Sequence, residues 1–486
     1  MTPEQSKKFQ YWQWRTIIGT MIGYSIFYLV RKNFSFAIPG LTVEYGITKA
    51  TFGAIIAIAS FVYGLSKLIN GFLADRLDGR WHLVTGLSVS AFVNIMFGAG
   101  AMICAYFTGV TEGNKFVHAL VILFAILYVI NNMFQGCGFP PCNRLITHWV
   151  PPHELATKMS IWNTSHSVGA FIAAILCGYI MGHTGTDMSA DSDMRARVIE
   201  NTANITSPVD AAAAEAYVDS ALLNIGAWQW AFWIPALIAV LGVIFIIVTL
   251  RDTPSSVGLP ELKGTKVSKE ETPEEKKEFN QFIWNKVIKS PIVWILSLSV
   301  FFVYIVRLAV LDWGPSFLQE SRGLSPALSA WTVAIFEAFG VAGMLVAGIV
   351  SDKLFNGRAQ RTCVFCMVGV IIFLLLFCFL PADTNPVVLM LVLACIGFFL
   401  YGPQALIGVV ASNQVTRRGA SSANGIIGFV AYLSPIISGF VFGHIADNPD
   451  FGWEGVFKIM IFVAFLGLLT LLTLWNKKTD GYSEES

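Results

Sequence analysis

Apolar residues form long runs along most of the chain, and short polar stretches separate these runs. Twelve runs are long enough to cross a bilayer as an α-helix, which needs roughly 20 apolar residues. They fall into two groups of six, so we predict an all-α membrane protein built from two pseudo-symmetric six-helix halves. The expected spans are about 16–40, 52–74, 83–107, 117–146, 157–183, 227–250, 291–318, 328–351, 362–381, 387–412, 420–446 and 453–476.

Two polar stretches interrupt this pattern. Residues 251–290 are rich in Lys and Glu, which is typical of a linker between an N-terminal half at 1–250 and a C-terminal half at 291–486. Residues 184–225, between the fifth and sixth spans, are acidic, and Ala211–Leu223 has the alanine content of a short helix. We expect this second stretch to be an external insertion that the protein tolerates, with a functional role as the alternative.

The distribution of Lys and Arg predicts the orientation in the membrane. With the N-terminus inside, the inner segments carry 22 of the 32 basic residues and the outer segments carry five. Basic residues concentrate in cytoplasmic loops. We therefore expect a multi-pass protein of the cell (inner) membrane, with the linker and both termini in the cytoplasm.

The composition narrows the class of protein further. Hydrophobic residues make up 55% of the chain and charged residues only 13%, whereas soluble domains carry about 25% charged residues. The net charge of +1 gives no reason to expect a nucleic acid partner. Cys363-x-x-Cys366 lacks the second ligand pair of a metal site. The sequence has no phosphate-cradling loop and no catalytic triad, so we expect that the protein is not an enzyme and holds no metal or cofactor. We also expect it to be a monomer.

Two arginines lie inside apolar spans at matching places in the two halves. Arg31 (in FYLVRKNF) and Arg307 (in VYIVRLAV) each follow a tyrosine by three residues, Tyr28 and Tyr304. An arginine in the middle of a bilayer costs about 2.5–3.5 kcal/mol on insertion scales. Guanidinium groups bind phosphate oxygens through two parallel hydrogen bonds. The pair therefore predicts an anion site between the halves, at the middle of the membrane.

The alternative is that a buried carboxylate neutralises each arginine. Glu337 in the eighth span is the better candidate for this charge pairing. Asp312 lies near the outer end of the seventh span, so it is the weaker one.

Further polar side chains lie near the arginines along the chain. His166 lies in a polar patch within the fifth span. The ordinary pKa of a histidine, about 6.5, is close to the second pKa of a phosphate monoester, so we expect the two groups to be able to share a proton. Tyr24 lies on the same helix face as Tyr28 and Arg31. Lys32 and Lys67 either add positive potential or pair with acids. Weaker candidates for contacts with the organic part of a substrate are Gln135, Asn163, Tyr401 and Gln404.

A polar signature follows the second span of each half. The two copies are Gly71–Arg80 (GFLADRLDGR) and Gly348–Arg358 (GIVSDKLFNGR). Both resemble the loop signature of the major facilitator superfamily, whose expected architecture is a pair of parallel repeats. Its glycine allows helices to approach closely, and its charged residues pair across helices. The charged residues that we expect to act in gating or charge pairing are Asp75, Arg76, Asp352 and Lys353.

Within that superfamily the chain resembles the organophosphate:phosphate antiporter family, most closely its glycerol-3-phosphate transporters and next its hexose-phosphate transporters. The resemblance implies exchange of a small phosphorylated metabolite for inorganic phosphate across the lipid bilayer by alternating access. It also implies that Arg31 and Arg307 grip the phosphoryl group and that His166 assists. The motifs that carry the resemblance are FYLVRKNF (27–34), FQGCGFPPC (134–142), IWNTSHSVG (161–169), RDTPSSVGLP (251–260), RLAVLDWGPSFLQE (307–320), YGPQALIG (401–408) and GWEG (452–455).

Several functions remain open at this point. Glycerol 3-phosphate is the favoured organic substrate, and hexose 6-phosphate or phosphoglycerate are the alternatives. A transporter-like sensor of sugar phosphates shares the same motifs. A proton-coupled carrier of organic anions, with Glu337 as the proton site, is a further alternative. Pro140-Pro141 and Gly402-Pro403 are expected to interrupt the fourth and tenth spans, where bending helices can gate a cavity.

Overall fold

The computed structural model describes residues 2–74, 77–150, 158, 161–203, 211–260, 277–278, 281–381 and 383–477. In this part of the chain the regular elements are helices. There is also one isolated β-bridge, between Thr186 and Ile225. The α-helices are α1 (Pro3–Tyr45), α2 (Lys49–Ala74), α3 (Gly79–Gly98), α4 (Gly100–Thr108), α5 (Asn114–Gln135), α6 (Phe139–Trp149), α8 (Ser165–His183), α9 (Ser192–Thr202), α10 (Ala211–Leu222), α11 (Ala227–Thr249), α13 (Pro291–Arg322), α14 (Pro326–Leu354), α15 (Ala359–Phe379), α16 (Pro386–Ala431), α17 (Phe442–Asp447) and α18 (Gly452–Leu472). Short 3₁₀ or π turns are η1 (Pro254–Val257), η2 (Ile283–Ile288) and η3 (Ile436–Val441).

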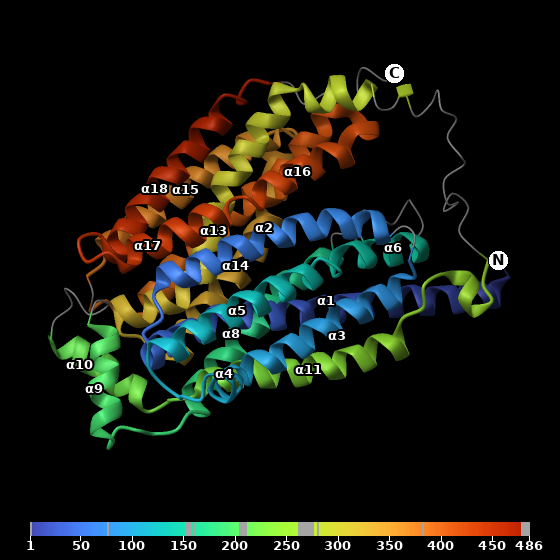
Figure 1. The fold of residues 1–486 in the computed structure, drawn as a ribbon. Helices are drawn as coiled ribbons and strands as arrows, with labels where there is room; N and C mark the ends of the chain where they lie inside the picture. The colour runs from blue at the N-terminus through green and yellow to red at the C-terminus, as the bar shows by residue number, and fades with distance from the viewer. Residues whose placement is uncertain are drawn as a thin grey trace.

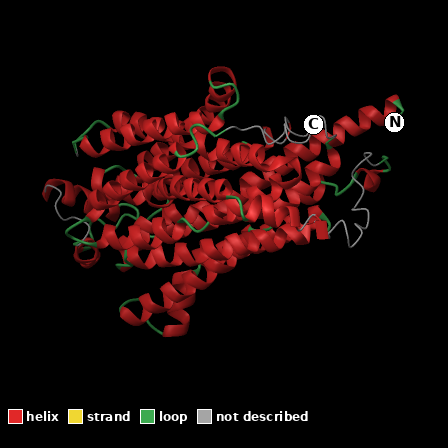
Figure 2. Ribbon diagram, turned by 90° about the horizontal axis from the view of Figure 1, so that it is seen from above, coloured by secondary structure: helices red, strands yellow, loops and turns green. Residues whose placement is uncertain are grey.

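The predicted all-α membrane architecture is confirmed. Eleven helical segments of the described residues are long and apolar enough to cross a membrane. The first predicted span lies in α1, which falls outside these eleven because Arg31, Lys32 and Asn33 interrupt its apolar run. This helix has 43 residues and packs inside the bundle against α8, α11 and α13. Figure 2 shows that the long helices share one general direction, as a bilayer requires.

The helices form two groups (Figure 1). The first group runs from α1 to α11, in blue to green, and the second from α13 to α18, in yellow to red. Residues 261–276 and 279–280 of the predicted linker are outside the described part. The proposed boundaries at 250 and 291 therefore stay a prediction.

In the described residues, the two groups pack against each other from one end of the bundle as far as the level of Tyr63 in α2, and they separate toward the other end. A Cβ added at Gly53, near the start of α2, would overlap the carbonyl of Gly439 in η3, and one added at Gly178 in α8 would overlap Ala330, near the start of α14. Near the ends of these same helices, no atom of the described residues lies within 4 Å of a Cβ added at Gly71 in α2 or at Gly348 in α14. Figure 1 agrees, because the groups diverge toward the end at which α1 begins.

Proline acts differently in the two spans where we expected interruptions. The fourth span is broken between Gln135 and Phe139, just before Pro140-Pro141, as predicted. The tenth span is not, since α16 runs for 46 residues through Gly402-Pro403 and on to Ala431. Within a packed bundle, neighbouring helices can compensate the single N–H that proline removes, so the expected interruption at Pro403 is wrong.

The insertion forms a small helical unit at the end opposite the N-terminus (Figure 1). The expected helix is present as α10, and α9 precedes it. Asn201 donates a hydrogen bond of 2.9 Å to the carbonyl of Val43 at the end of α1. Arg195 in α9 forms an ion pair of 2.7 Å with Asp219 in α10. The unit thus folds on itself and rests on α1.

Candidate anion site

Arg31 projects from α1 toward aromatic rings. Its guanidinium carbon lies 3.8 Å from the ring centre of Tyr63 in α2 and 5.9 Å from that of Tyr28. The side chain is partly exposed. Among the described residues no carboxylate forms an ion pair with it. Cation–π contact stabilises such a charge by roughly 0.5–2 kcal/mol but leaves it without neutralisation.

Arg307 is held much more firmly. Its Nε donates a hydrogen bond of 3.0 Å to the hydroxyl of Tyr401 in α16, and that hydroxyl donates to Oε1 of Glu337 in α14. The same carboxylate oxygen lies 3.6 Å from the guanidinium. Glu337 is fully buried, and its Oε2 has no hydrogen-bond partner among the described residues. The alternative that a buried carboxylate pairs with each arginine is therefore correct for Arg307 and wrong for Arg31 within the described residues.

Lys67 in α2 is the third cation of the site. Its Nζ lies 4.8 Å from the ring centre of Phe139 and 5.1 Å from that of Tyr432, which follows α16. No ion pair of Lys67 is found in the part of the chain that the structure covers.

Tyr432 and Tyr63 connect the two helix groups at this level. Their ring centres lie 4.9 Å apart, and the rings meet edge to face at 71°. The ring of Tyr304 in α13 lies 6.1 Å from that of Tyr432. Sequence reasoning missed both Tyr63 and Tyr432. Tyr63 precedes Lys67 by four residues and so lies on the same face of α2, a spacing that would have revealed it. Tyr432 has no comparable signal.

His166 and Tyr28 complete this group of side chains. Their rings lie 5.9 Å apart. Nδ1 of His166 donates to the carbonyl of Asn163, because a carbonyl oxygen only accepts. Nε2 is then the nitrogen that can meet a ligand. The charges of Arg31 and Arg307 both act on Tyr28, and the charge of Arg307 also acts on His166. These four side chains are therefore electrostatic neighbours.

The remaining sequence candidates occupy different places. Lys32 forms an ion pair of 2.6 Å with Asp312, joining α1 to α13, so its charge is neutralised. Tyr24 is 7% exposed and stacks on Trp162 with 5.1 Å between ring centres, which is a packing position. Gln135 donates to Ser90 over 3.3 Å.

The charges that surround the site do not balance. Arg31, Lys67 and Arg307 are cations, and Glu337 is the carboxylate beside them in the described chain. With His166 neutral, the described groups leave a net charge of +2. A phosphate monoester carries about −1.5 to −2 at neutral pH, which matches this excess.

The residues expected to act in gating lie elsewhere or outside the described part. Asp75 and Arg76 are outside the described residues, as is the side chain of Asp352. Lys353 is exposed.

A buried charge cluster that the sequence did not reveal lies at the end where the two groups meet. Lys49 at the start of α2 is 1% exposed and lies 3.1 Å from Glu320 and 3.5 Å from Asp447. Trp453 donates a hydrogen bond of 2.8 Å to Glu320. The cation comes from the first helix group and both carboxylates come from the second.

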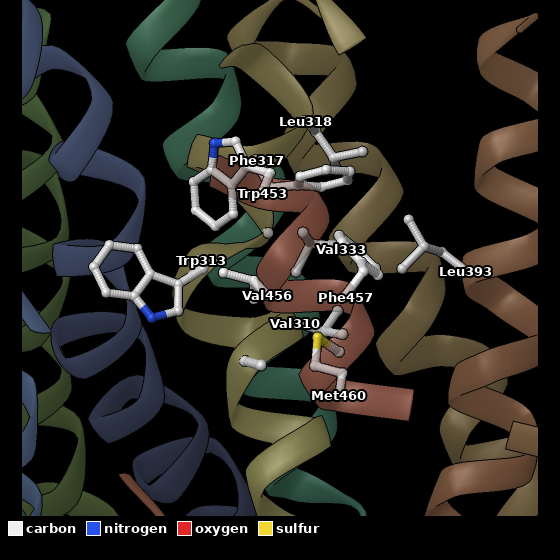
Figure 3. Close-up of a pocket in the computed structure, with 12 residues that line it drawn as sticks. Val310, Trp313, Phe317, Leu318, Val333, Leu393, Trp453, Val456, Phe457 and Met460 are labelled. Carbon is white, nitrogen blue, oxygen red and sulfur yellow. The ribbon is translucent and has the colours of Figure 1, made fainter. Parts of the chain in front are cut away.

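A small cavity in the second group is separate from the anion site. Figure 3 shows Phe317, Trp453, Phe457 and Met460 gathered around it, with Val310 and Val333 beside them. Its volume of about 20 Å³ and apolar lining fit loose packing between α13 and α18 rather than ligand binding. Among the described residues, no group of three or more His, Cys, Asp or Glu side chains lies close enough together to hold a metal ion.

Comparison with known proteins places this geometry in context. The sequence profile of the Major Facilitator Superfamily matches residues 20–439. The chain is 33% identical to the glycerol-3-phosphate transporter of Bacillus subtilis (strain 168), over 95% of this chain and 92% of that protein. It is 31% identical to a probable hexose phosphate transport protein of Chlamydia pneumoniae, over 97% and 92%. It is 28% identical to the membrane sensor protein UhpC of Escherichia coli (strain K12), over 98% and 95%.

A solved structure shows the same fold at much lower sequence similarity. A D-xylose-proton symporter superposes with a TM-score of 0.66 at 15% identity, over 96% of this chain and 99% of that one.

Proposed function

Because this chain belongs to the major facilitator superfamily, and within it to the organophosphate:phosphate antiporter family, we propose that it exchanges a phosphorylated small metabolite for inorganic phosphate by alternating access. The family consists of membrane transporters rather than enzymes. Glycerol 3-phosphate is the first candidate for the organic substrate, because the Bacillus subtilis relative is named for it. A hexose phosphate is the second, after the Chlamydia pneumoniae relative.

The observation that supports this proposal is the excess charge of +2 beside partly exposed aromatic side chains. Arg31, like Lys67, has no carboxylate partner in the described chain, so the paired N–H donors of its guanidinium are available to a phosphoryl group. Arg307 adds a second set, oriented by Tyr401 and Glu337. Lys67 contributes a third positive charge. Nε2 of His166 can accept the proton of a singly protonated phosphate or, once protonated, donate to the dianion.

The same charge explains why transport would be an exchange. Closing the site without a ligand would bury cations that have lost both water and counter-ion, which is expensive. A bound dianion offsets that cost. The carrier would then pass between its two open forms only when phosphate or the organic phosphate is bound.

The described conformation fits one of the two forms that alternating access requires. The helix groups meet at the insertion end, where Lys49 pairs with Glu320 and Asp447, and they stand apart at the other end. If both termini lie in the cytoplasm, as we expect, the end where the groups stand apart is the cytoplasmic one. The described conformation would then be the inward-facing form.

An exchange assay in proteoliposomes tests the proposal. Vesicles that contain labelled phosphate should release it quickly when glycerol 3-phosphate or phosphate is added outside, and slowly in buffer that contains neither. Equally fast release without an external substrate would refute obligate exchange. Competition by a panel of phosphate esters would identify the organic substrate.

A sensor is the second candidate, because a relative of similar coverage is named as one. A sensor would bind sugar phosphate with little exchange in the same vesicles. A proton-coupled carrier with Glu337 as its proton site would instead move protons with its substrate and would not depend on phosphate.

A further inference from the structure

The two arginines of the candidate site are held in different ways. Arg307 is fixed through its side chain, by Tyr401 and Glu337, and the residues on either side of it in α13 are apolar. The side chain of Arg31 meets only aromatic rings in the contacts that the described residues make. The direction of Arg31 therefore depends on these ring contacts and on how its segment of α1 is held.

Three buried asparagines act on that segment. The side-chain amide of Asn94 in α3 donates over 3.0 Å to the carbonyl of Val30, and Asn131 in α5 donates to the same carbonyl over 3.0 Å. Val30 immediately precedes Arg31. Asn33 donates over 2.7 Å to Asn94 and over 3.0 Å to the carbonyl of Ala231 in α11.

The amides of Asn33 and Asn94 use all of their donors. Asn94 donates a second hydrogen bond of 2.8 Å to the carbonyl of Ser90, so both donors of Asn33 and of Asn94 are engaged. The side-chain oxygen of Asn131 has no hydrogen-bond partner among the described residues. The three side chains are 1–2% exposed. Helices α3, α5 and α11 are thus all hydrogen bonded to one short segment of α1, and that segment contains Arg31.

We propose that Asn33, Asn94 and Asn131 are positioning residues for Arg31, which fix the direction in which its guanidinium meets a phosphoryl group without touching the ligand themselves. This inference rests on the proposed function, because it assigns the network to the phosphate site. A bidentate contact depends strongly on direction, since both N–H groups must align with two oxygens at once. Polar contacts between membrane helices also hold bundles together in general, and the test must separate the two roles.

The chain provides a matched control for that test. Asn132 is next to Asn131, is also 2% exposed, and donates over 2.9 Å to the carbonyl of Tyr128 within its own helix α5. Asn131→Leu and Asn132→Leu therefore each remove one buried amide hydrogen bond, but only Asn131→Leu removes a contact with α1.

The experiment measures the phosphate dissociation constant and the melting temperature without phosphate, for the full-length protein in detergent. Asn131→Leu should weaken phosphate binding by roughly threefold to twentyfold, the range that single interhelical hydrogen bonds span in membrane proteins. Asn132→Leu should leave the dissociation constant unchanged, whatever it does to the melting temperature. If Asn131→Leu does not fold, Asn131→Ser, which keeps a shorter donor, should show a smaller loss of affinity.

Other outcomes have clear meanings. Lower melting temperatures with an unchanged dissociation constant for the Asn131 variants would overturn the positioning role and leave the network purely structural. Equal losses of affinity for the Asn131 and Asn132 variants would overturn it as well. A wild-type protein that does not bind phosphate would refute the proposed function itself, and this inference with it.

Discussion

At the scale of single residues, the candidate site combines cations with tyrosines in place of carboxylates. Tyrosine rings attract a guanidinium or ammonium group through their faces, yet they cannot neutralise it. Arg31 above Tyr63 is the clearest case. Burying such a cation at membrane depth is unfavourable in free energy. Binding an anion would therefore stabilise it more than it would stabilise a cation that is already paired.

We expect Arg31→Lys to reduce phosphate exchange by about tenfold or more, because an ammonium is a point charge and cannot form two parallel hydrogen bonds with a phosphoryl group. Initial rates of exchange in proteoliposomes check this. Arg15→Lys is the matched control. Arg15 lies on the same helix and donates to the carbonyls of Thr249 and Val248 over 3.0 Å, which a lysine can also do. Near-normal exchange by Arg31→Lys would contradict the bidentate interpretation.

The sequence could identify most of the cations but not their surroundings. An arginine or histidine inside an apolar run stands out because its burial is expensive, so Arg31, Arg307 and His166 were found. A buried tyrosine is ordinary in a membrane helix, so Tyr432 was missed. Which carboxylate pairs with which cation depends on helix packing, and this is why Asp312 turned out to pair with Lys32 rather than with Arg307.

At the scale of the elements, α2 is central because it carries both Lys67 and Lys49. The first lies at the candidate site, and the second joins α13 and α17 through Glu320 and Asp447. Movement of α2 relative to the second helix group would therefore change the site and the closed end together.

We expect Lys49→Met to shift the protein away from the form that is closed at the insertion end. The change leaves the buried Glu320 and the partly exposed Asp447 without their cation. Removing one partner of a buried pair costs about 3–5 kcal/mol. A cysteine placed at Ile56, which is 2% exposed and faces Gly439, reports the shift through faster labelling by an impermeant thiol reagent.

The control for this experiment is Lys458→Met. Lys458 also pairs with a carboxylate, Glu454, at 2.7 Å, but the two side chains are 70% and 76% exposed. Exposed pairs contribute little, so labelling should not change. Equal labelling in the Lys49→Met and wild-type backgrounds would mean that the buried cluster does not hold this end closed.

Element boundaries were predictable where they depend on apolar length alone. The second and sixth spans match α2 and α11 closely. The sequence failed where tertiary packing decides, as in α16, which continues through Pro403 and across the loop that we expected near residue 415. Lys49 was missed for a similar reason. A lysine beside a span normally indicates a solvated loop. Lys49 is buried because four helix ends meet around it.

At the scale of the whole molecule, the insertion is attached as a separate unit. Its two ends are close together, because Thr186 and Ile225 exchange backbone hydrogen bonds of 2.8 and 3.1 Å. Its core consists of Val198, Val218 and Leu222 with Val43 of α1.

We expect that replacing residues 188–223 by a two-residue turn will leave the exchange rate within about twofold of the wild-type rate. The bridge between Thr186 and Ile225 already holds the cut ends in place, and closing a short loop costs little entropy. The melting temperature should fall slightly, since Val43 loses its apolar neighbours. Loss of exchange in a variant that is folded and inserted in the membrane would show that the insertion takes part in transport.

The contact between Gly53 and Gly439 has a consequence for natural variation. The three atoms nearest to a Cβ added at Gly53 all belong to the main chain of Gly439 and Phe440. Even one added methyl group would have to push the halves apart. If the protein works by alternating access, as proposed, inherited changes at this contact would alter the time spent in each form and leave the phosphate-binding groups unchanged.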